Sequence, residues 1–261
     1  MPCVEDLKLR AGSECPLGAN ERQRWPLRYV CSTAGLSPAR MMDNASVVKI
    51  DEVKLSQCEI VREPLRSFEQ AMIYADDLVE IAKRQKGPGR RTAERALNRA
   101  IVVMTVAAWQ VLLEELTKIA LIEIEKLSAD EPEGIVHRAL YHSIASSANA
   151  AIGRFNTPNA HNAKQLLATV GIEADLRWEI SFGSQKLDKA ATEKEINCWL
   201  DVRHKIAHGS PTLPDNKVLC KTVNGPTLRR SEAERCMRFF RRVSLETALE
   251  VDERLCDLAS S

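Results

Sequence analysis

The sequence has little of several features that would mark a particular class of protein. Its 37 lysines and arginines nearly balance 36 acidic residues, so the net charge of +1 gives no overall reason to expect a nucleic acid or a membrane as partner. The eight cysteines include no C-x-x-C pair, which argues against a zinc site or a redox dithiol. No run of about 20 apolar residues is present, and the first residues lack a signal-peptide core. We therefore expect a cytoplasmic protein with reduced thiols and no membrane segment.

Familiar catalytic and nucleotide-binding motifs are missing too. There is no G-x-S-x-G, no catalytic-cysteine context, no P-loop and no strand-glycine-helix pattern. His204 and His208 stand four residues apart, as zinc ligands do in metalloprotease helices. However, Lys205 occupies the place of the general-base glutamate of those enzymes, and no third ligand is evident nearby. The sequence therefore predicts neither a metal nor a cofactor.

Helical periodicity runs along most of the chain. It predicts helices over residues 63–86, 92–127, 130–153, 157–171, 190–208 and 231–255. Capping signals begin three of them, at Asp130, at Thr157 with Pro158, and at Ser231. The second helix is apolar almost all round and should be central, with curvature or a break because of its length. The predicted fold is an all-α helical bundle.

Two stretches depart from the helical pattern. Residues 210–230 hold three prolines and the Asn224, Gly225 pair, which predicts a loop or a short hairpin. The first 45 residues hold four of the eleven prolines and no sustained periodicity. We expect a poorly ordered extension over 1–50 and the helical domain over 57–258. Met41 and Met42 precede the periodic part, so we hypothesise that the native chain starts at one of them, which an intact mass beginning at residue 1 would refute.

The strongest functional indication is the segment 203–209 (RHKIAHG), which closes the helix predicted over 190–208. Gly209 should end this helix. On a helical wheel Arg203 falls among apolar side chains, where a guanidinium needs an anionic partner, a cleft or a subunit interface. His208 points about 140° away from Arg203 on an ideal helix. We expect either that the helix loosens at His208 or that two protomers contribute to one cleft about a twofold axis.

This segment resembles the R-x4-6-H signature of HEPN domains, in which Asn, Asp or His commonly follows the arginine, as His204 does here. The similarity is closest to the RiboL-PSP-HEPN branch and extends to residues 107–113 (AAWQVLL) and to 155–171, which begin FNTP. Gln110 stands where relatives often carry glutamate. The resemblance covers about residues 60–256. It implies a HEPN-like helical domain that dimerises with its signature helices facing one another and, in active members, a metal-independent endoribonuclease.

The residue types suit that chemistry. A ribose 2′-hydroxyl that attacks the adjacent phosphate needs a base, and an imidazole such as that of His208 titrates near neutrality. The planar guanidinium of Arg203 fits a phosphate and would stabilise the charge of the phosphorane. His204 would orient the phosphate or act as the second acid-base group. We expect a ribonuclease that leaves a 2′,3′-cyclic phosphate and acts as a toxin or defence effector, with RNA as substrate and an antitoxin protein as a candidate partner.

Two alternatives remain. In a non-catalytic HEPN module that binds RNA, nucleotide or a partner protein, Arg203 would be a structural interface residue and His208 a helix C-cap. In the second alternative, the protein is an unrelated helical bundle in which the R-x4-6-H signature occurs by chance.

RNA also needs a positively charged approach, and two clusters of arginines are candidates. They are Arg229, Arg230, Arg235, Arg238, Arg241 and Arg242 on the last helix, and Arg90 and Arg91 after the first. The alternative for each cluster is a solvated surface, a helical face for the first and an interhelical turn for the second. If the arginines contact phosphates, binding should weaken steeply with salt.

Overall fold

The computed structural model describes residues 59–129, 134–172, 176–182 and 185–260, all of which belong to one compact unit, Ala45–Ser261. The helices are α2 (Arg62–Arg84), α3 (Arg90–Ala129), α4 (Gly134–Arg154), α5 (Ala160–Ala168), α6 (Lys189–Ala207) and α7 (Arg230–Ser260). Short strands β1 (Ile180–Phe182) and β2 (Gln185–Leu187) form one antiparallel hairpin, and β3 (Cys220–Thr222) and β4 (Gly225–Thr227) form another. The all-α prediction is confirmed. The predicted extension, the candidate starts Met41 and Met42, and the cap at Asp130 lie outside the described residues.

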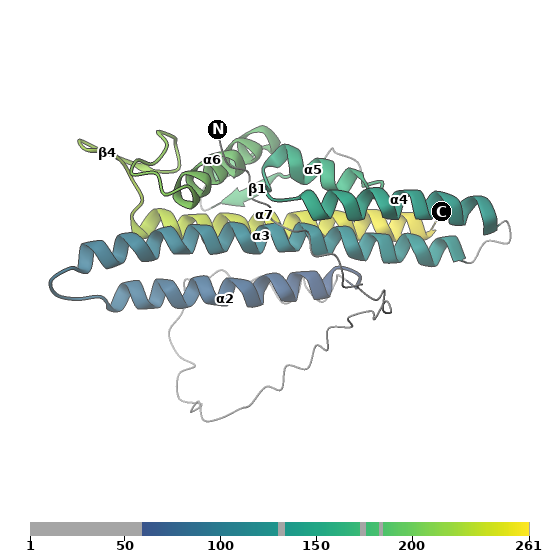
Figure 1. Ribbon diagram of the computed structural model, residues 1–261, viewed down its shortest axis with the longest axis horizontal. Helices are drawn as coiled ribbons and strands as arrows, with labels where there is room; N and C mark the ends of the chain where they lie inside the picture. Colours follow the sequence, from purple (N-terminus) through teal and green to yellow (C-terminus); the bar gives the residue numbers. More distant parts are fainter. Residues whose placement is uncertain (1–58, 130–133, 173–175, 183–184, 261) are drawn as a thin grey trace, which may run out of the picture. The chain divides into compact units, whose positions relative to one another are not determined.

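Helix α3 is the central element, as its apolar composition predicts. It packs against α2 and α7 most extensively, and also against α4, α5 and α6 (Figure 1). Trp109, Leu112, Leu113 and Leu116 are fully buried in the core that results. The helix runs unbroken for 40 residues, so of the two outcomes expected, curvature or a break, the break does not occur. By length and composition part of α3 is apolar enough to cross a membrane, but half of that part is buried, as in the core helix of a globular unit.

Helices α2 and α7 lie along α3 (Figure 1). The buried face of α2 contains the residues that its periodicity predicts, among them Leu65, Phe68 and Met72. The start of α2 is held by Asp252 of α7, whose carboxylate accepts hydrogen bonds from the backbone N–H groups of Ile60 and Val61 at 3.1 and 3.2 Å. These contacts connect segments nearly 200 residues apart in sequence.

Several helix boundaries differ from the sequence prediction. Helix α5 starts after Asn159, whose side chain accepts a hydrogen bond from the N–H of Asn162 at 2.8 Å, so Thr157 is not its cap. Helix α7 starts before Ser231, because Glu232 accepts a hydrogen bond from the backbone N–H of Arg229 at 2.9 Å. The hairpin predicted within 210–230 is present as β3 and β4. The hairpin of β1 and β2 was not predicted, since strands of three residues carry too little periodicity.

Candidate functional site

Helix α6 carries the segment 203–209 and is fixed in the core by one apolar face and one buried carboxylate. Trp199 and Val202 on this face are fully buried. Glu195, only 1% exposed, accepts a hydrogen bond from Nη2 of Arg235 on α7 at 2.7 Å, and Nζ of Lys217 lies 3.8 Å from its other oxygen. A buried carboxylate with two cationic partners ties α6 both to α7 and to the loop that follows α6. The direction in which α6 ends is thereby fixed.

Helix α5 holds α6 from another side. The backbone N–H of Ala160 donates to Oδ1 of Asn197 at 3.1 Å, which satisfies one of the free donors at the start of α5. Lys164 and Glu193 form an ion pair at 3.0 Å in which both side chains are largely covered. These two contacts join successive turns of α5 and α6, which run antiparallel to each other.

The segments 107–113 and 155–158, which carry part of the HEPN resemblance, meet in space. The indole N–H of Trp109 donates to the carbonyl of Pro158 at 3.1 Å. Nε2 of Gln110 donates to the carbonyl of Phe155 at 2.8 Å and to the carboxylate of Glu114 at 3.0 Å. A glutamate at position 110 could not donate the bond to Phe155 when ionised. Gln110 therefore has a structural role between α3 and the segment that leads into α5.

The end of α6 is a Schellman motif, with His208 as the C-cap residue. The N–H of Gly209 donates to the carbonyl of Ile206 at 3.0 Å, and the N–H of Ser210 donates to that of Lys205 at 2.9 Å. Gly209 has a φ of +64°, a conformation that glycine adopts without the steric cost other residues incur. The predicted stop at Gly209 is confirmed, and it fixes the backbone on which His208 stands.

Arg203 lies half-buried on α6, beside the buried Val202 and the partly buried Ile206. Its guanidinium makes no hydrogen bond or ion pair with any residue that the structure describes. The position matches the wheel prediction. Such a cation was expected to have an anionic partner, a cleft or a subunit interface, and no carboxylate of the described chain is its partner. The charge is available to a ligand or a second subunit.

His204 and His208 are both exposed, and their rings lie 4.2 Å apart between centroids, tilted by 57°. The N–H of His208 still donates to the carbonyl of His204 at 3.0 Å, so the last turn stays helical. This hydrogen bond is kept although α6 ends at Ala207 and His208, with φ −86° and ψ 10°, no longer has helical dihedral angles. Arg203 makes no hydrogen bond to His208. One chain thus presents an imidazole pair and a half-buried cation on different sides of one helix end.

The sequence model of the RiboL-PSP-HEPN family matches residues 73–251, well over half of the chain. The chain belongs to the RiboL-PSP-HEPN family. Comparison with curated proteins and with solved structures gave no match. The matched region includes the second half of α2, the whole of α3 to α6 and most of α7, so the resemblance based on segment 203–209 and its two companion segments is confirmed.

The HEPN domain uses the arginines of α7 in different ways. Arg241 is only 4% exposed; its two terminal nitrogens donate to the carboxylate of Asp76 on α2 at 2.7 and 3.3 Å, and its Nε donates to Glu69 at 3.3 Å. Burial favours the neutral form, but Asp76 and Glu69 outweigh it and raise the pKa of Arg241. Contrary to the prediction, Arg241 belongs to the interface between α2 and α7 and not to an exposed phosphate-binding face.

The other predicted phosphate contacts divide into two groups. Four arginines lie within 4 Å of a carboxylate: Arg235 with Glu195, Arg242 with Glu246, Arg230 with Glu234, and Arg90 with Glu94. The remaining three, Arg229, Arg238 and Arg91, form no ion pair with a described residue. The structure therefore does not gather the eight into one positive wall.

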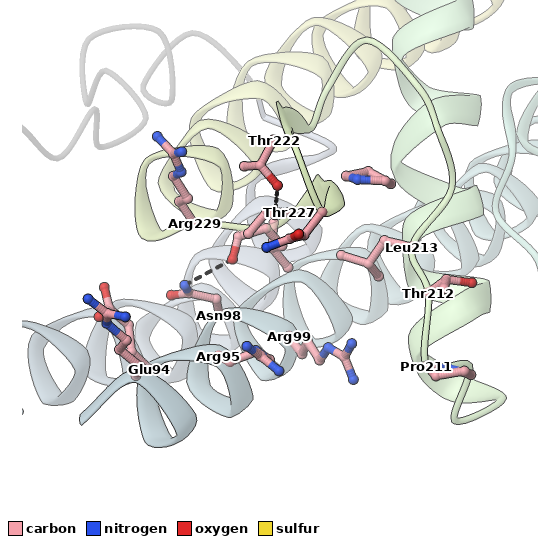
Figure 2. Close-up of a pocket in the computed structure, with 14 residues that line it drawn as sticks. Glu94, Arg95, Asn98, Arg99, Pro211, Thr212, Leu213, Thr222, Thr227 and Arg229 are labelled. Carbon is pink, nitrogen blue, oxygen red and sulfur yellow. Dashed lines mark hydrogen bonds between the residues drawn. The ribbon is translucent and has the colours of Figure 1, made fainter. Parts of the chain in front are cut away.

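A cleft of about 700 Å³ opens where the N-terminal part of α3 meets the segment after α6 and the β3–β4 hairpin (Figure 2). Arg91 and Arg229 line it, and so do Arg95 and Arg99, which the sequence prediction missed. The available signal was the spacing of Arg91, Arg95 and Arg99, each four residues from the next. Elsewhere in the described ranges, no group of three or more His, Cys, Asp or Glu side chains is placed to hold a metal ion.

Proposed function

We propose that this HEPN domain is a metal-independent endoribonuclease. The observation that carries the proposal is the chemistry exposed at one helix end: the cation of Arg203, without a carboxylate partner in the described chain, and the imidazole pair of His204 and His208. An electrophilic guanidinium and two acid-base groups are what cleavage of a phosphodiester by its own ribose requires. The rigid cap at Gly209 supports the proposal because it holds the imidazoles in place.

In the proposed reaction, one imidazole takes the proton of the ribose 2′-hydroxyl while the 2′-oxygen attacks the adjacent phosphorus. The bond from phosphorus to the 5′-oxygen breaks, and the second acid-base group gives that oxygen a proton. The products are a 2′,3′-cyclic phosphate and a 5′-hydroxyl. We assign the base to His208 and the fixed cation to Arg203, whose two parallel N–H groups suit the phosphorane oxygens. His204 supplies the second acid-base group or orients the phosphate.

The proposed site is shared by two copies of the chain. Within one chain Arg203 and His208 share no hydrogen bond, and on an ideal helix the two side chains point about 140° apart. A twofold axis beside the end of α6 would set Arg203 of one protomer against His208 of the other. Each dimer would then carry two equivalent composite sites.

The test is cleavage of a mixed RNA by the full-length protein in EDTA. The wild type should cut and leave cyclic phosphate ends, while Arg203→Ala and His208→Ala should each lose activity by at least about a hundredfold. His161→Ala, which alters an exposed histidine of α5, is the matched control and should retain wild-type activity. Activity abolished by EDTA, or kept by both motif variants, would refute the proposal.

Mixing the two inactive variants tests the shared site. After subunits exchange, half of the dimers combine an Arg203→Ala chain with a His208→Ala chain, and one of the two sites in each is intact. Activity should therefore return to about one quarter of the wild-type value. A site formed within one chain predicts no recovery at all.

The second candidate function is a non-catalytic HEPN module, and the position of His208 as the C-cap of α6 is the observation that favours it. A cationic side chain there complements the helix dipole without any catalytic role. In that case the wild type does not cleave, and His208→Ala changes only stability.

A further inference from the structure

The cleft beside the α6 terminus has the size of a ligand site and walls from three parts of the chain. Its volume of about 700 Å³ lies within the range of about 300–1,000 Å³ that ligand pockets occupy. Figure 2 shows Arg95 and Arg99 extending from α3 toward the segment of Pro211, Thr212 and Leu213, while Arg229 points away from α3. Arg203, His204 and His208 are not among the lining residues, so the cleft is adjacent to the proposed catalytic groups and distinct from them.

The floor of the cleft is a line of three arginines on one side of α3, which we call the arginine ridge: Arg91, Arg95 and Arg99. They stand four residues apart, so each lies about 6 Å along the helix axis from the next. No described residue forms an ion pair with any of them. The one carboxylate that lines the cleft, that of Glu94, lies 3.7 Å from Arg90.

This arrangement is unfavourable for the helix alone. Like charges at four-residue spacing repel, by about 0.2–0.5 kcal/mol for each pair. The first turn of α3 contains Arg90 and Arg91 and no acidic residue, the wrong sign for the positive end of a helix dipole. Among the described residues, the ion pair of Glu94 with Arg90 offsets only part of these costs. An anion that is not part of this unit would offset both.

A second, independent observation comes from two polar atoms at the base of the cleft. Asn98 is only 2% exposed and donates from Nδ2 to the carbonyl of Leu228 at 3.3 Å, which fixes its amide so that Oδ1 is the other atom. Neither that buried oxygen nor the buried Nε of Arg99 has a hydrogen-bond partner among the described residues. Buried polar atoms are nearly always paired, so an unpaired acceptor and an unpaired donor on adjacent residues of one cleft leave both atoms in need of a partner from outside the described residues. Unpaired atoms also occur in the core, at Thr105 and Thr192, so these two support a ligand only together with the arginine ridge.

We propose that the cleft binds a single strand of RNA, with successive phosphates on the arginine ridge. The roughly 6 Å repeat of the ridge is comparable to the separation of adjacent phosphates in an extended strand. Phosphate oxygens accept from the arginines, and ribose hydroxyls supply a donor, as the unpaired atoms require. Pro211 and Leu213 on the opposite wall offer apolar surface to a base. The identity of the ligand as RNA rests on the proposed function; the anionic character of the ligand does not.

The position of the opposite wall gives the cleft a role in catalysis. Pro211 follows Gly209 by two residues, so a strand held on the ridge passes the end of α6 where the imidazoles stand. The ridge residues are positioning residues, which hold RNA in register while Arg203 and His208 act on one phosphate of the same strand. Substitution of the ridge should therefore raise KM more than it lowers kcat.

The test measures binding separately from cleavage. A fluorescent single-stranded RNA is titrated with full-length His208→Ala protein over a range of NaCl concentrations, and fluorescence anisotropy gives the Kd. Adding Arg91→Gln, Arg95→Gln and Arg99→Gln together should raise the Kd at least tenfold. The slope of log Kd against log salt should fall by about two, the value expected for three lost phosphate contacts on a single strand. Arg138→Gln on α4, which covers the other end of α3, is the matched control and should change neither quantity (Figure 1).

The outcomes separate this inference from the proposed function. If the triple variant binds RNA as the control does, while the wild type still cleaves, the cleft assignment is wrong and the nuclease stands. If the triple variant loses binding and the wild type never cleaves, the cleft stands and the nuclease falls. Equal competition by a nucleoside triphosphate or by a polyglutamate peptide would overturn the choice of RNA in favour of a small nucleotide or an acidic protein segment. Circular dichroism of the triple variant guards against loss of fold.

Discussion

Arginines serve opposite purposes on α3 and on α7. On α7, Arg235 and Arg241 reach carboxylates of neighbouring helices, and their charge stabilises the packing of α6 and α2. On α3, Arg95 and Arg99 reach no carboxylate of the described chain and face a cleft. The residue type is the same, and both sets lie on long helices of the same core. What differs is whether a carboxylate is fixed within reach, so only the first set stabilises the fold and only the second is available to a ligand.

The largest effect should come from Arg241→Ala. The change removes the cation of α7 that Asp76 and Glu69, both on α2, share, and losing one partner of such a buried pair costs about 3 kcal/mol. Urea unfolding measures it. Arg238→Ala, on the same helix but without an ion pair in the described chain, should cost less than about 0.5 kcal/mol. Equal losses in the two variants would remove the distinction between a structural and a free arginine on α7.

Arg235→Gln should cost somewhat less, about 2 kcal/mol, because Glu195 keeps Lys217 at 3.8 Å when its 2.7 Å partner is weakened. The reason for the loss is a carboxylate, 1% exposed, that is left poorly paired. The double variant with Glu195→Gln should regain more than half of the lost free energy of unfolding, since it removes the buried charge. A double variant as unstable as the sum of the two single variants would show that the two side chains are not coupled.

Gly209→Ala should cost about 1 kcal/mol, because a residue with a side chain is strained at a φ of +64°. No atom lies within 4 Å of the position a Cβ would take, so the cost comes from the backbone conformation and not from a clash. Gly153→Ala is the matched control: it has equally open surroundings and an ordinary helical position in α4, and it should stabilise by about 0.5 kcal/mol. Thermal unfolding should move the two variants in opposite directions, and movement in the same direction would contradict the argument.

The sequence predicted local features of the fold and the candidate site well. Periodicity and the glycine at 209 located α6 and its end, and the wheel placed Arg203 at the apolar face. Arg241 could not be judged in this way, because its partner Asp76 is 165 residues away in sequence and the pairing depends on how α2 packs against α7. The cap Asn159 was missed in favour of Thr157, two residues earlier, since both residue types cap helices.

The cleft was beyond sequence reasoning for the same reason. Its walls come from α3, the segment after α6 and the β3–β4 hairpin, which are more than 100 residues apart at the extremes. The spacing of Arg91, Arg95 and Arg99 was visible, but a stripe of arginines reads equally as a solvated helix face until the opposite wall is known. The opposite wall and the unpaired oxygen of Asn98, neither of which the sequence can reveal, together favour the ligand-binding interpretation.

The smallest expected effect on stability is a gain and not a loss, and it tests most directly the comparison between the arginines of α3 and those of α7. Arg95→Gln should raise the free energy of unfolding by a few tenths of a kcal/mol, because it relieves repulsion from Arg91 and Arg99 at four-residue spacing. The same change should weaken RNA binding several-fold. On α7, Arg235→Gln should lower stability and leave RNA affinity unchanged for the folded protein. Urea unfolding measures the change in stability of both variants, and fluorescence anisotropy measures the change in their RNA affinity. If Arg95→Gln destabilised the protein, the arginine ridge would have a structural partner, and the case for a ligand would be lost.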